Sequence, residues 1–307
     1  MVTVSVVVPA TDRPDTLGRC LRAVDAGIDT PDESIVVDGP ADLSAAAARN
    51  HGARRATGDV VLFIDADVEI HADAIARVRR TMSERPDLTA VFGSYDDAPD
   101  DRSTVSAFRN LLHHHVHHHG AGPAETFWTG LGAIRRERFL TSGGFDEARF
   151  PHPSVEDVDL GMRLAADGDE LLLDPTIQGT HLKSWTLRSM LETDLLRRGV
   201  PWVALMVRDR RAPTGLNLGW AHRLSALASI AMVVGACWRR TSVVVVALGA
   251  LVALNRRFYA LLTRRLGPLA ALAGIALHVL HHLASVASVP IGLAVGALEA
   301  RRPEIDG

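Results

Sequence analysis

The stretch Val60–Asp67, which reads VVLFIDAD, decides the fold of this 307-residue chain. Its first five residues are continuously apolar, which is typical of a strand buried on both faces of a parallel sheet. Apolar runs at Val4–Val8 and Ser34–Val37 come earlier, and a helical pattern follows each of the three runs. This alternation predicts an α/β fold, with helices on both faces of a layered sheet. The expected helices cover residues 14–24, 43–57 and 72–83, and a further strand covers residues 89–93.

Two carboxylates follow the central strand directly. Asp65 and Asp67 are two residues apart, so both side chains can lie on one side of the sheet's carboxyl edge, where open α/β sheets bind ligands. Because the two charges repel each other, a hard divalent cation that also binds phosphate oxygens would stabilise them. The pattern therefore predicts Mg²⁺ or Mn²⁺. In the structural alternative, Asp65 caps the next helix and Asp67 is only solvated.

Acidic residues stand at two further places that matter for function. Asp38 ends the second apolar run, where it can accept hydrogen bonds from a base or a ribose, or form an ordinary Asp-Gly turn. Glu156 and Asp157 begin a helical pattern, and one of them can act as a general base toward an attacking hydroxyl. Alternatively, Ser154 and Asp157 form a capping box, and the acidic pair only complements the helix dipole. The residues alone leave these alternatives open.

Six short motifs together carry a family resemblance. In chain order they are Val4–Pro9, Val36–Asp38, Ala48–Asp59, Phe63–Asp67, Gly143–Asp146 and Glu156–Leu160. With these motifs the chain resembles the family-2 glycosyltransferases of the GT-A fold over about residues 2–185. The resemblance implies a Rossmann-like mixed sheet flanked by helices, and a sugar donor that is a nucleotide-diphosphate sugar.

The resemblance also implies roles on the donor side. Asp38 corresponds to the residue that contacts the nucleotide base, and Pro9 and Arg49 fall in the donor-binding motifs. Asp65 and Asp67 correspond to the Asp-x-Asp pair, the first near the donor ribose and the second on the metal. On this basis we expect Asp65 and Asp67 both to be available to the metal.

On the acceptor side, Asp157 corresponds to the catalytic base and Glu156 to its neighbour. Residues that resemble the lining of the acceptor pocket are Trp128, Gly130 and Gly132. His181 falls where related enzymes place a polar group that reaches the metal or the diphosphate, although it can equally be a structural histidine. The implied reaction is inversion by direct displacement, in which the metal neutralises the leaving diphosphate.

Two departures from the family pattern affect specificity. Asp38 is followed by Gly-Pro rather than by a second Asp, and the short interval from Asp38 to Arg49 lacks a strand and a helix found in many relatives. The Gln-x-x-Arg-Trp signature of the processive members is absent from the sequence. We therefore expect the transfer of a single sugar, from a donor whose nucleotide base the sequence does not specify.

Composition divides the chain into two parts. Charged residues are frequent up to about Arg211, whereas the stretch Leu216–Leu298 is dominated by Ala, Leu, Val and Gly. We expect a catalytic domain at residues 1–212 and an all-α, membrane-associated region at residues 213–307. A net charge of −3, without a basic stripe, does not support a nucleic-acid footprint, so we expect no nucleic-acid partner. No signal peptide is visible at the N-terminus, so the catalytic domain is expected in the cytoplasm.

The apolar region contains segments of different length. Leu224–Trp238 and Val243–Leu254 are shorter than the roughly 20 residues of a spanning helix, whereas Pro268–Leu298 is long enough. Asn255–Arg265 alternates arginine pairs with apolar residues, which is typical of an interfacial amphipathic helix. Arginine pairs at the breaks favour membrane association over a buried soluble domain. Because arginines occur at every break, including Arg301-Arg302, they do not fix the topology.

The tract His113–His119 contains six histidines in seven residues, within a predicted helix at residues 105–119. Imidazoles one turn apart can chelate a metal. No carboxylate or cysteine follows at a matching spacing, so we expect a solvated or interfacial helix.

The sequence thus predicts a membrane-bound glycosyltransferase at the cytoplasmic face, which acts on a lipid-linked or membrane-proximal acceptor. Membrane lipid is its other expected partner, and a cell-envelope glycan its expected product. One alternative is a polyprenyl-phosphate glycosyltransferase, whose phosphate acceptor needs no general base. The second is a non-catalytic membrane scaffold that keeps a nucleotide-sugar-binding fold.

Overall fold

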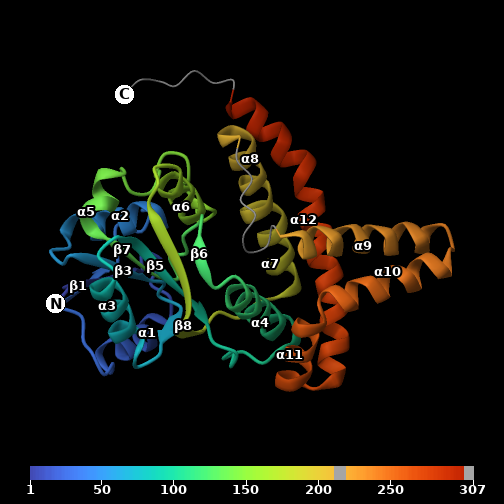
Figure 1. Cartoon of the computed structure of the whole chain (residues 1–307), viewed down its shortest axis with the longest axis horizontal. Coiled ribbons are helices and arrows are strands. Elements are labelled where there is room, and N and C mark those ends of the chain that lie inside the picture. The colour runs from blue at the N-terminus through green and yellow to red at the C-terminus, as the bar shows by residue number, and fades with distance from the viewer. Residues whose placement is uncertain (211–218, 301–307) are drawn as a thin grey trace. The chain divides into compact units, whose positions relative to one another are not determined.

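The computed structural model describes residues 1–210 and 219–300. The chain divides into two units (Figure 1): unit 1 comprises Met1–Asp100 and His113–Lys183, and unit 2 comprises Asp101–Leu112 and the chain from Ser184 onward. The expected boundary between residues 212 and 213 and the arginine pair Arg301-Arg302 lie outside the described residues.

Unit 1 is built on a mixed sheet of eight strands. They are β1 (Val4–Pro9), β2 (Glu33–Val37), β3 (Val60–Ile64), β4 (Val68–Ile70), β5 (Leu88–Tyr95), β6 (Gly122–Ala124), β7 (Leu131–Arg135) and β8 (Glu170–His181). The order is β2-β1-β3-β7-β5-β8-β4, and β6 also pairs with β8. Strand β1 is parallel to β2 and β3, whereas β7 runs antiparallel between β3 and β5. This confirms the predicted mixed α/β sheet.

Helices cover both faces of this sheet. They are α1 (Leu17–Asp25), α2 (Ala45–Arg55), α3 (Ala74–Glu84), α5 (Arg136–Thr141) and α6 (Glu156–Ala166), and α4 (Thr104–His119) contributes its second half to unit 1. Figure 1 shows α2, α5 and α6 on one side of the sheet and α1 and α3 on the other. The rings of Phe63 on β3, Phe139 on α5 and Phe145 lie 5.2–5.5 Å apart, centroid to centroid. Strand β3 is fully buried, as its apolar sequence predicts.

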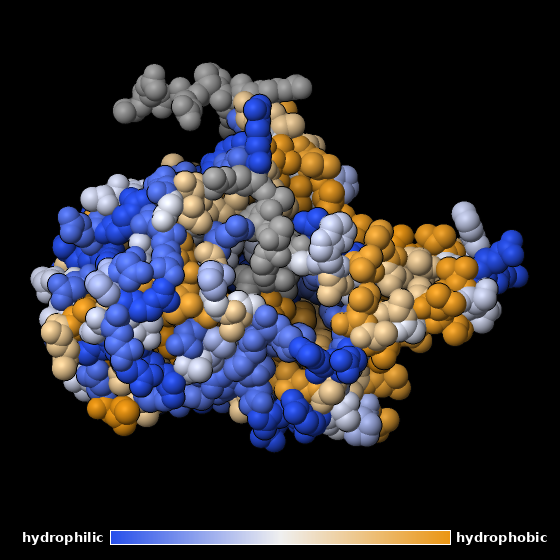
Figure 2. Space-filling view, in the orientation of Figure 1, coloured by the Kyte–Doolittle hydropathy of each residue, from blue (hydrophilic) through white to orange (hydrophobic). Residues whose placement is uncertain are grey.

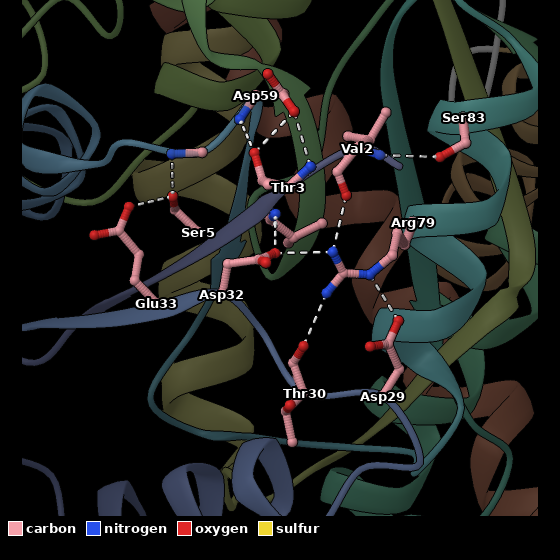
Figure 3. A network of polar contacts seen from close by, with 12 residues as sticks. Val2, Thr3, Ser5, Asp29, Thr30, Asp32, Glu33, Asp59, Arg79 and Ser83 are labelled. Carbon is pink, nitrogen blue, oxygen red and sulfur yellow. Dashed lines mark hydrogen bonds and ion pairs between the residues drawn. The ribbon is translucent and has the colours of Figure 1, made fainter.

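A polar network fastens the start of β1 to α3 (Figure 3). The Arg79 guanidinium donates to Asp29 and Asp32, each at 2.8 Å, and also to the carbonyl oxygens of Val2 and Thr30. Backbone hydrogen bonding and the Arg79 side chain lower the pKa of Asp32. This network lies at the end of β1 opposite to Pro9, so its role is structural.

Unit 2 is helical. Besides the first part of α4 it contains α7 (Leu187–Glu192), the π-helix η1 (Thr193–Gly199), α8 (Val200–Asp209), α9 (Trp220–Cys237), α10 (Thr241–Leu254), α11 (Arg256–Leu266) and α12 (Pro268–Glu299). Small residues allow close packing between these helices. A Cβ added at Gly292 would lie 2.5 Å from Val203, and one at Gly296 would lie 2.8 Å from the Ala204 carbonyl. Helix α12 therefore packs directly against the backbone of α8, as membrane helices do.

Two helices are long and apolar enough to cross a membrane, namely α9 and α12. Helices α10 and α11 pass the same criterion only as a pair, with a bend of 77° between them, so up to three spans fit the described residues. The expectation that the segment at Leu224 is too short was wrong, because α9 begins earlier, at Trp220, and has 18 residues. Figure 2 shows apolar residues over α9, α10 and α12, and polar residues over much of unit 1.

Helix α11 is amphipathic, but its apolar side is covered by protein. Phe258 and Leu262 have no exposed surface, and α11 packs on α12, where Gly274 leaves room for the Leu262 side chain. The predicted amphipathic pattern is therefore present in α11. The prediction that its apolar residues face a membrane interface was wrong, because they are buried against other parts of the protein. The basic residues Arg264 and Arg265 remain at its C-terminal end.

Candidate active site

The site is built around a buried arginine on α2. Arg49 is 5% exposed, and its guanidinium lies 2.6 Å from Asp65 Oδ1 and 3.0 Å from Glu156 Oε1. Burial by itself lowers the pKa of Arg49, but the two carboxylates outweigh it and raise the pKa above its ordinary value. Arg49 is therefore charged, and it joins the residue that follows β3 to the first turn of α6.

The Asp-Ala-Asp sequence forms a turn between β3 and β4. The Val68 N–H donates to the Asp65 carbonyl at 2.9 Å, and the Asp65 N–H donates to the Gly130 carbonyl at 3.2 Å. Because a strand and not a helix follows this turn, the alternative in which Asp65 caps a helix was wrong. The turn also brings Asp65 beside the glycine-rich segment expected on the acceptor side.

Asp67 faces the end of β8. Val68 pairs with His181 in the antiparallel register of β4 and β8, and the Leu182 N–H donates to the Asp67 carbonyl at 2.8 Å. As a result, His181 Nε2 lies 3.5 Å from Asp67 Oδ2. Burial alone would raise the pKa of Asp67, but hydrogen bonding and charge from His181 prevail and lower it. The Asp67 carboxylate is therefore held in its anionic form.

These residues fit a divalent cation that the sequence predicts. A carboxylate and an imidazole converge at Asp67 and His181, and the His181 ring is stacked on Tyr95 at 4.2 Å with an interplanar angle of 10°. The Asp67 side chain is 28% exposed, so an incoming phosphate can share the cation. Arg49 binds Asp65 through Oδ1, so the other carboxylate oxygen of Asp65, Oδ2, is the one that could bind the cation.

The first turn of α6 presents the two acidic residues. The predicted capping box is wrong: the N-cap is Val155, without a side-chain cap, and the Ser154 N–H donates to Glu156 Oε2 at 2.8 Å. Asp157 Oδ1 accepts from the Val158 N–H at 2.8 Å, and Oδ2 lies 3.4 Å from the Thr129 N–H. Both carboxylates are buried, at 4% and 8% exposure, and both have the hydrogen-bond partners that a buried carboxylate needs.

Glycines bring the expected acceptor segment against α6 and the sheet. A Cβ added at Gly161 would lie 2.2 Å from the Phe127 nitrogen, so α6 approaches this backbone too closely for any side chain. At Gly130 a Cβ would lie 2.2 Å from the Trp128 ring, and at Gly132 it would lie 2.2 Å from the Trp128 carbonyl. The indole of Trp128 therefore lies directly against Gly130 and is 7% exposed.

Pro9 and Asp38 lie at the neighbouring strand ends. Pro9 ends β1 and pairs with Val37, and Asp38 follows directly after β2. The Asp38 side chain is 64% exposed, and Arg13 Nη2 lies 3.8 Å from Asp38 Oδ2. Asp38 therefore forms its ion pair with the exposed Arg13, whereas Arg49 pairs with Asp65 and Glu156. The direct step from β2 to α2 confirms the short interval between Asp38 and Arg49.

Two contacting residues were not singled out from the sequence. Asn50 donates to the Phe145 carbonyl at 2.8 Å and to Glu147 at 2.7 Å, and its Oδ1 accepts from the Phe145 N–H at 2.9 Å. It thereby fixes α2, which carries Arg49, to the Gly144 turn. Tyr95, which orients His181, ends the β5 strand. Both lie in or beside predicted elements, but neither residue type signals such a contact.

The histidine tract is partly buried, which corrects the expectation of a solvated or interfacial helix. His117 is 5% exposed, and its Nδ1 lies 2.9 Å from the Gly93 carbonyl, while His114 Nδ1 lies 2.9 Å from the Tyr95 carbonyl. The His113 ring lies 4.6 Å from that of Trp128. These two contacts attach this side of α4 to β5. Within the tract His113–His119, only His118 and His119 are exposed.

The chain was compared with known proteins. Residues 35–140 match the family model described as "Glycosyl transferase family 2". No curated protein sequence matches the chain. Among solved structures, the chain is similar to a mannosyltransferase from Pyrobaculum calidifontis in complex with GDP-Man and Mn²⁺, with a TM-score of 0.53 and 15% identity over 97% of this chain and 87% of that one.

Two further structures have lower TM-scores. GalNAc-T7 with UDP, GalNAc and Mn²⁺ gives 0.44, with 16% identity over 68% of this chain and 48% of that one. A mycobacterial protein gives 0.46, with 19% identity over 67% and 74%. The match to the family 2 model thus lies mostly within unit 1, and the mixed sheet flanked by helices has the GT-A fold.

Proposed function

We propose that this chain is a membrane-bound, metal-dependent, inverting glycosyltransferase that moves a single sugar from a nucleotide-diphosphate donor to an acceptor hydroxyl at the cytoplasmic membrane face. One observation carries the proposal: Arg49 joins the Asp-Ala-Asp turn to the first turn of α6. Residues suited to a diphosphate and a residue suited to deprotonating an acceptor are thereby held in one cluster.

The donor would bind at the carboxyl ends of β1, β2 and β3, the edge at which open sheets bind ligands. Pro9 and Asp38 lie at two of these ends, where Asp38 can accept hydrogen bonds from the base. Asp67 and His181 would hold Mn²⁺ or Mg²⁺ together with Asp65 Oδ2, and the imidazole favours Mn²⁺ because Mg²⁺ prefers oxygen ligands alone. When bound, the cation supplies positive charge beside the leaving diphosphate.

Asp157 would accept the proton of the attacking hydroxyl. Its backbone hydrogen bonds at the helix N-terminus fix the direction of the carboxylate, and a helix N-terminus favours the anionic form. Trp128, Gly130 and Gly132 would line the acceptor side of the same crevice, with Glu156 positioned through Arg49. Direct attack by a hydroxyl activated in this way inverts the anomeric centre, because no enzyme nucleophile intervenes.

The apolar helices α9 and α12 support a membrane-proximal or lipid-linked acceptor. Exposed apolar side chains such as Leu227 on α9 and Leu272 on α12, at 60% and 66%, would contact membrane lipid. A catalytic unit held near the bilayer meets such an acceptor at high effective concentration.

The test uses the full chain in detergent or in isolated membranes. A panel of nucleotide sugars is screened by thermal shift with and without Mn²⁺, since a ligand of the folded state raises the melting point. Release of nucleoside diphosphate is then measured for the parent, for Asp157→Asn and for the exposed control Asp25→Asn. We expect turnover in the parent and the control only.

Other outcomes distinguish the alternatives. Full turnover of Asp157→Asn with a polyprenyl phosphate would support the phosphate-acceptor enzyme. Donor binding without turnover of any nucleotide sugar, in the parent and in both variants, would support the scaffold.

A further inference from the structure

A cluster of histidines lies within unit 2, in helices that the transfer reaction does not use. His281 and His282 lie on α12, and His222 lies near the start of α9. One ring nitrogen from each of the three comes within 4.8 Å of the others. His281 is 5% exposed and His282 has no exposed surface. Three imidazoles from two helices thus converge inside an apolar region.

The hydrogen bonding of this cluster is incomplete. Among the described residues, His281 Nε2 and both ring nitrogens of His282 are buried without a hydrogen-bond partner. Every neutral imidazole has one donor and one acceptor nitrogen, and buried polar atoms are nearly always paired. An ion that accepts nitrogen lone pairs would explain why these atoms converge.

A carboxylate already orients one of the rings. Asp194 Oδ2 lies 2.8 Å from His281 Nδ1, and Asp194 Oδ1 lies 2.8 Å from Arg109 Nη2. The arginine keeps Asp194 anionic, so His281 carries its proton on Nδ1 and turns Nε2 toward the cluster. A carboxylate behind a ligand histidine is the usual arrangement at metal sites. Asp194 also lies in the π-helix η1, a distortion that is frequent at functional sites.

A fourth histidine has a different partner. His278 Nδ1 lies 2.9 Å from the Tyr259 hydroxyl on α11, and its ring lies 4.4 Å from that of His282. His278 therefore contacts the ring of His282 but is not one of the three histidines whose nitrogens converge.

We propose that His222, His281 and His282 bind one Zn²⁺ ion that fastens α9 to α12. Three neutral imidazoles suit Zn²⁺, which takes a fourth ligand from water or substrate at a site with three protein ligands. The site differs in chemistry from the cluster at Asp67, where oxygen ligands favour Mn²⁺ or Mg²⁺. The ion would join the start of one apolar helix to the middle of another.

The test measures zinc in the full chain, purified in detergent without a histidine tag. Chelator-treated protein is reloaded with Zn²⁺, and the bound metal is counted by mass spectrometry after dialysis. We expect about one zinc per chain in the parent and none in His222→Ala or His282→Ala. Asp194→Asn should weaken zinc binding about 10–100-fold, because it removes the carboxylate that orients His281.

Controls separate this site from the two other metal-binding features. The double variant His118→Ala/His119→Ala removes the exposed part of the histidine tract, and Asp67→Asn removes the proposed Mn²⁺ ligand; both should keep the zinc. Co²⁺ substitution should give the intense visible absorption of a four-coordinate site in these controls.

The proposal is overturned if His222→Ala and His282→Ala bind zinc like the parent, or if the double variant loses it. If His222→Ala or His282→Ala does not fold, a second measurement takes its place. This measurement is the melting point of the double variant His118→Ala/His119→Ala. Added Zn²⁺ should raise that melting point and a chelator should reverse the rise; an unchanged melting point contradicts the proposal.

Discussion

Arg49 Nη2 lies 2.6 Å from Asp65 Oδ1, so the first carboxylate of the Asp-Ala-Asp turn is neutralised by the protein itself. The second carboxylate, Asp67, faces His181 instead. The two acidic residues therefore have different protein partners in spite of their spacing: Asp65 ties the turn to α6 through Oδ1, and Asp67 faces a histidine, where we propose that the cation binds.

Replacing Arg49 tests this tie. Arg49→Met leaves Asp65 and Glu156 without their common partner, and breaking a buried ion pair in this way costs about 3–5 kcal/mol. We expect a clear fall in the melting temperature of the full chain, as measured by circular dichroism. The double variant Arg49→Met/Glu156→Gln should recover part of the loss, and Arg54→Met, at an exposed arginine, should change little. Equal stability of Arg49→Met and Arg54→Met would refute the tie.

Asp157→Asn separates catalysis from binding. The amide keeps the size of the side chain but cannot accept the proton, and the loss of a general base costs about 10²–10⁴-fold in rate. Donor-induced thermal shift should be unchanged, whereas turnover falls. Wild-type turnover in this variant would remove Asp157 from its proposed role.

Gly130→Ala tests the acceptor side. The added methyl would lie 2.2 Å from the Trp128 ring, so the indole must move from its position. We expect a raised KM for the acceptor with donor binding retained. The matched control is Gly18→Ala on α1, where the nearest atom is the flexible end of Arg22 at 3.3 Å. Identical acceptor kinetics for Gly130→Ala and the parent would argue against Trp128 in the acceptor pocket.

Acid should weaken the network at Arg79. The pKa of Asp32 is lowered in the folded protein, from an unfolded value of 3.8. Its contribution is therefore complete above that value and is lost as the pH falls through the folded pKa. We expect the melting temperature to drop as the pH falls below about 4, and to drop less steeply in Arg79→Leu, which should lose about 1–3 kcal/mol at neutral pH. Parallel pH curves for both proteins would contradict this account.

The sequence predicted the strands β1, β2, β3 and β5, because these are apolar and bounded by turns, but it did not predict β4, β6, β7 and β8. Val60–Ile64 was placed to the residue, since a strand buried on both faces leaves an uninterrupted apolar run. Helix ends were less accurate, as at α9, because Trp220, His222 and Arg223 interrupt the aliphatic pattern before Leu224 and are still helical.

The contacts within the site could not be predicted in the same way. Arg49 and Glu156 are 107 residues apart, and their ion pair depends on how α2 and α6 pack on the sheet. The histidine tract was misjudged for a related reason: imidazole is tolerated both in water and in a packed interior, so its burial against Gly93 follows from the position of α4. The η1 distortion beside His281 likewise has no local sequence signal.

The most direct test measures nucleoside diphosphate release as a function of Mn²⁺ concentration, for the parent, Asp67→Asn and the control Asp25→Asn. The account predicts that the parent and the control depend on Mn²⁺ and stop with chelator, while Asp67→Asn loses about 10²–10³-fold in turnover at any Mn²⁺ concentration. Parent-like turnover by Asp67→Asn, equally indifferent to chelator, would contradict it.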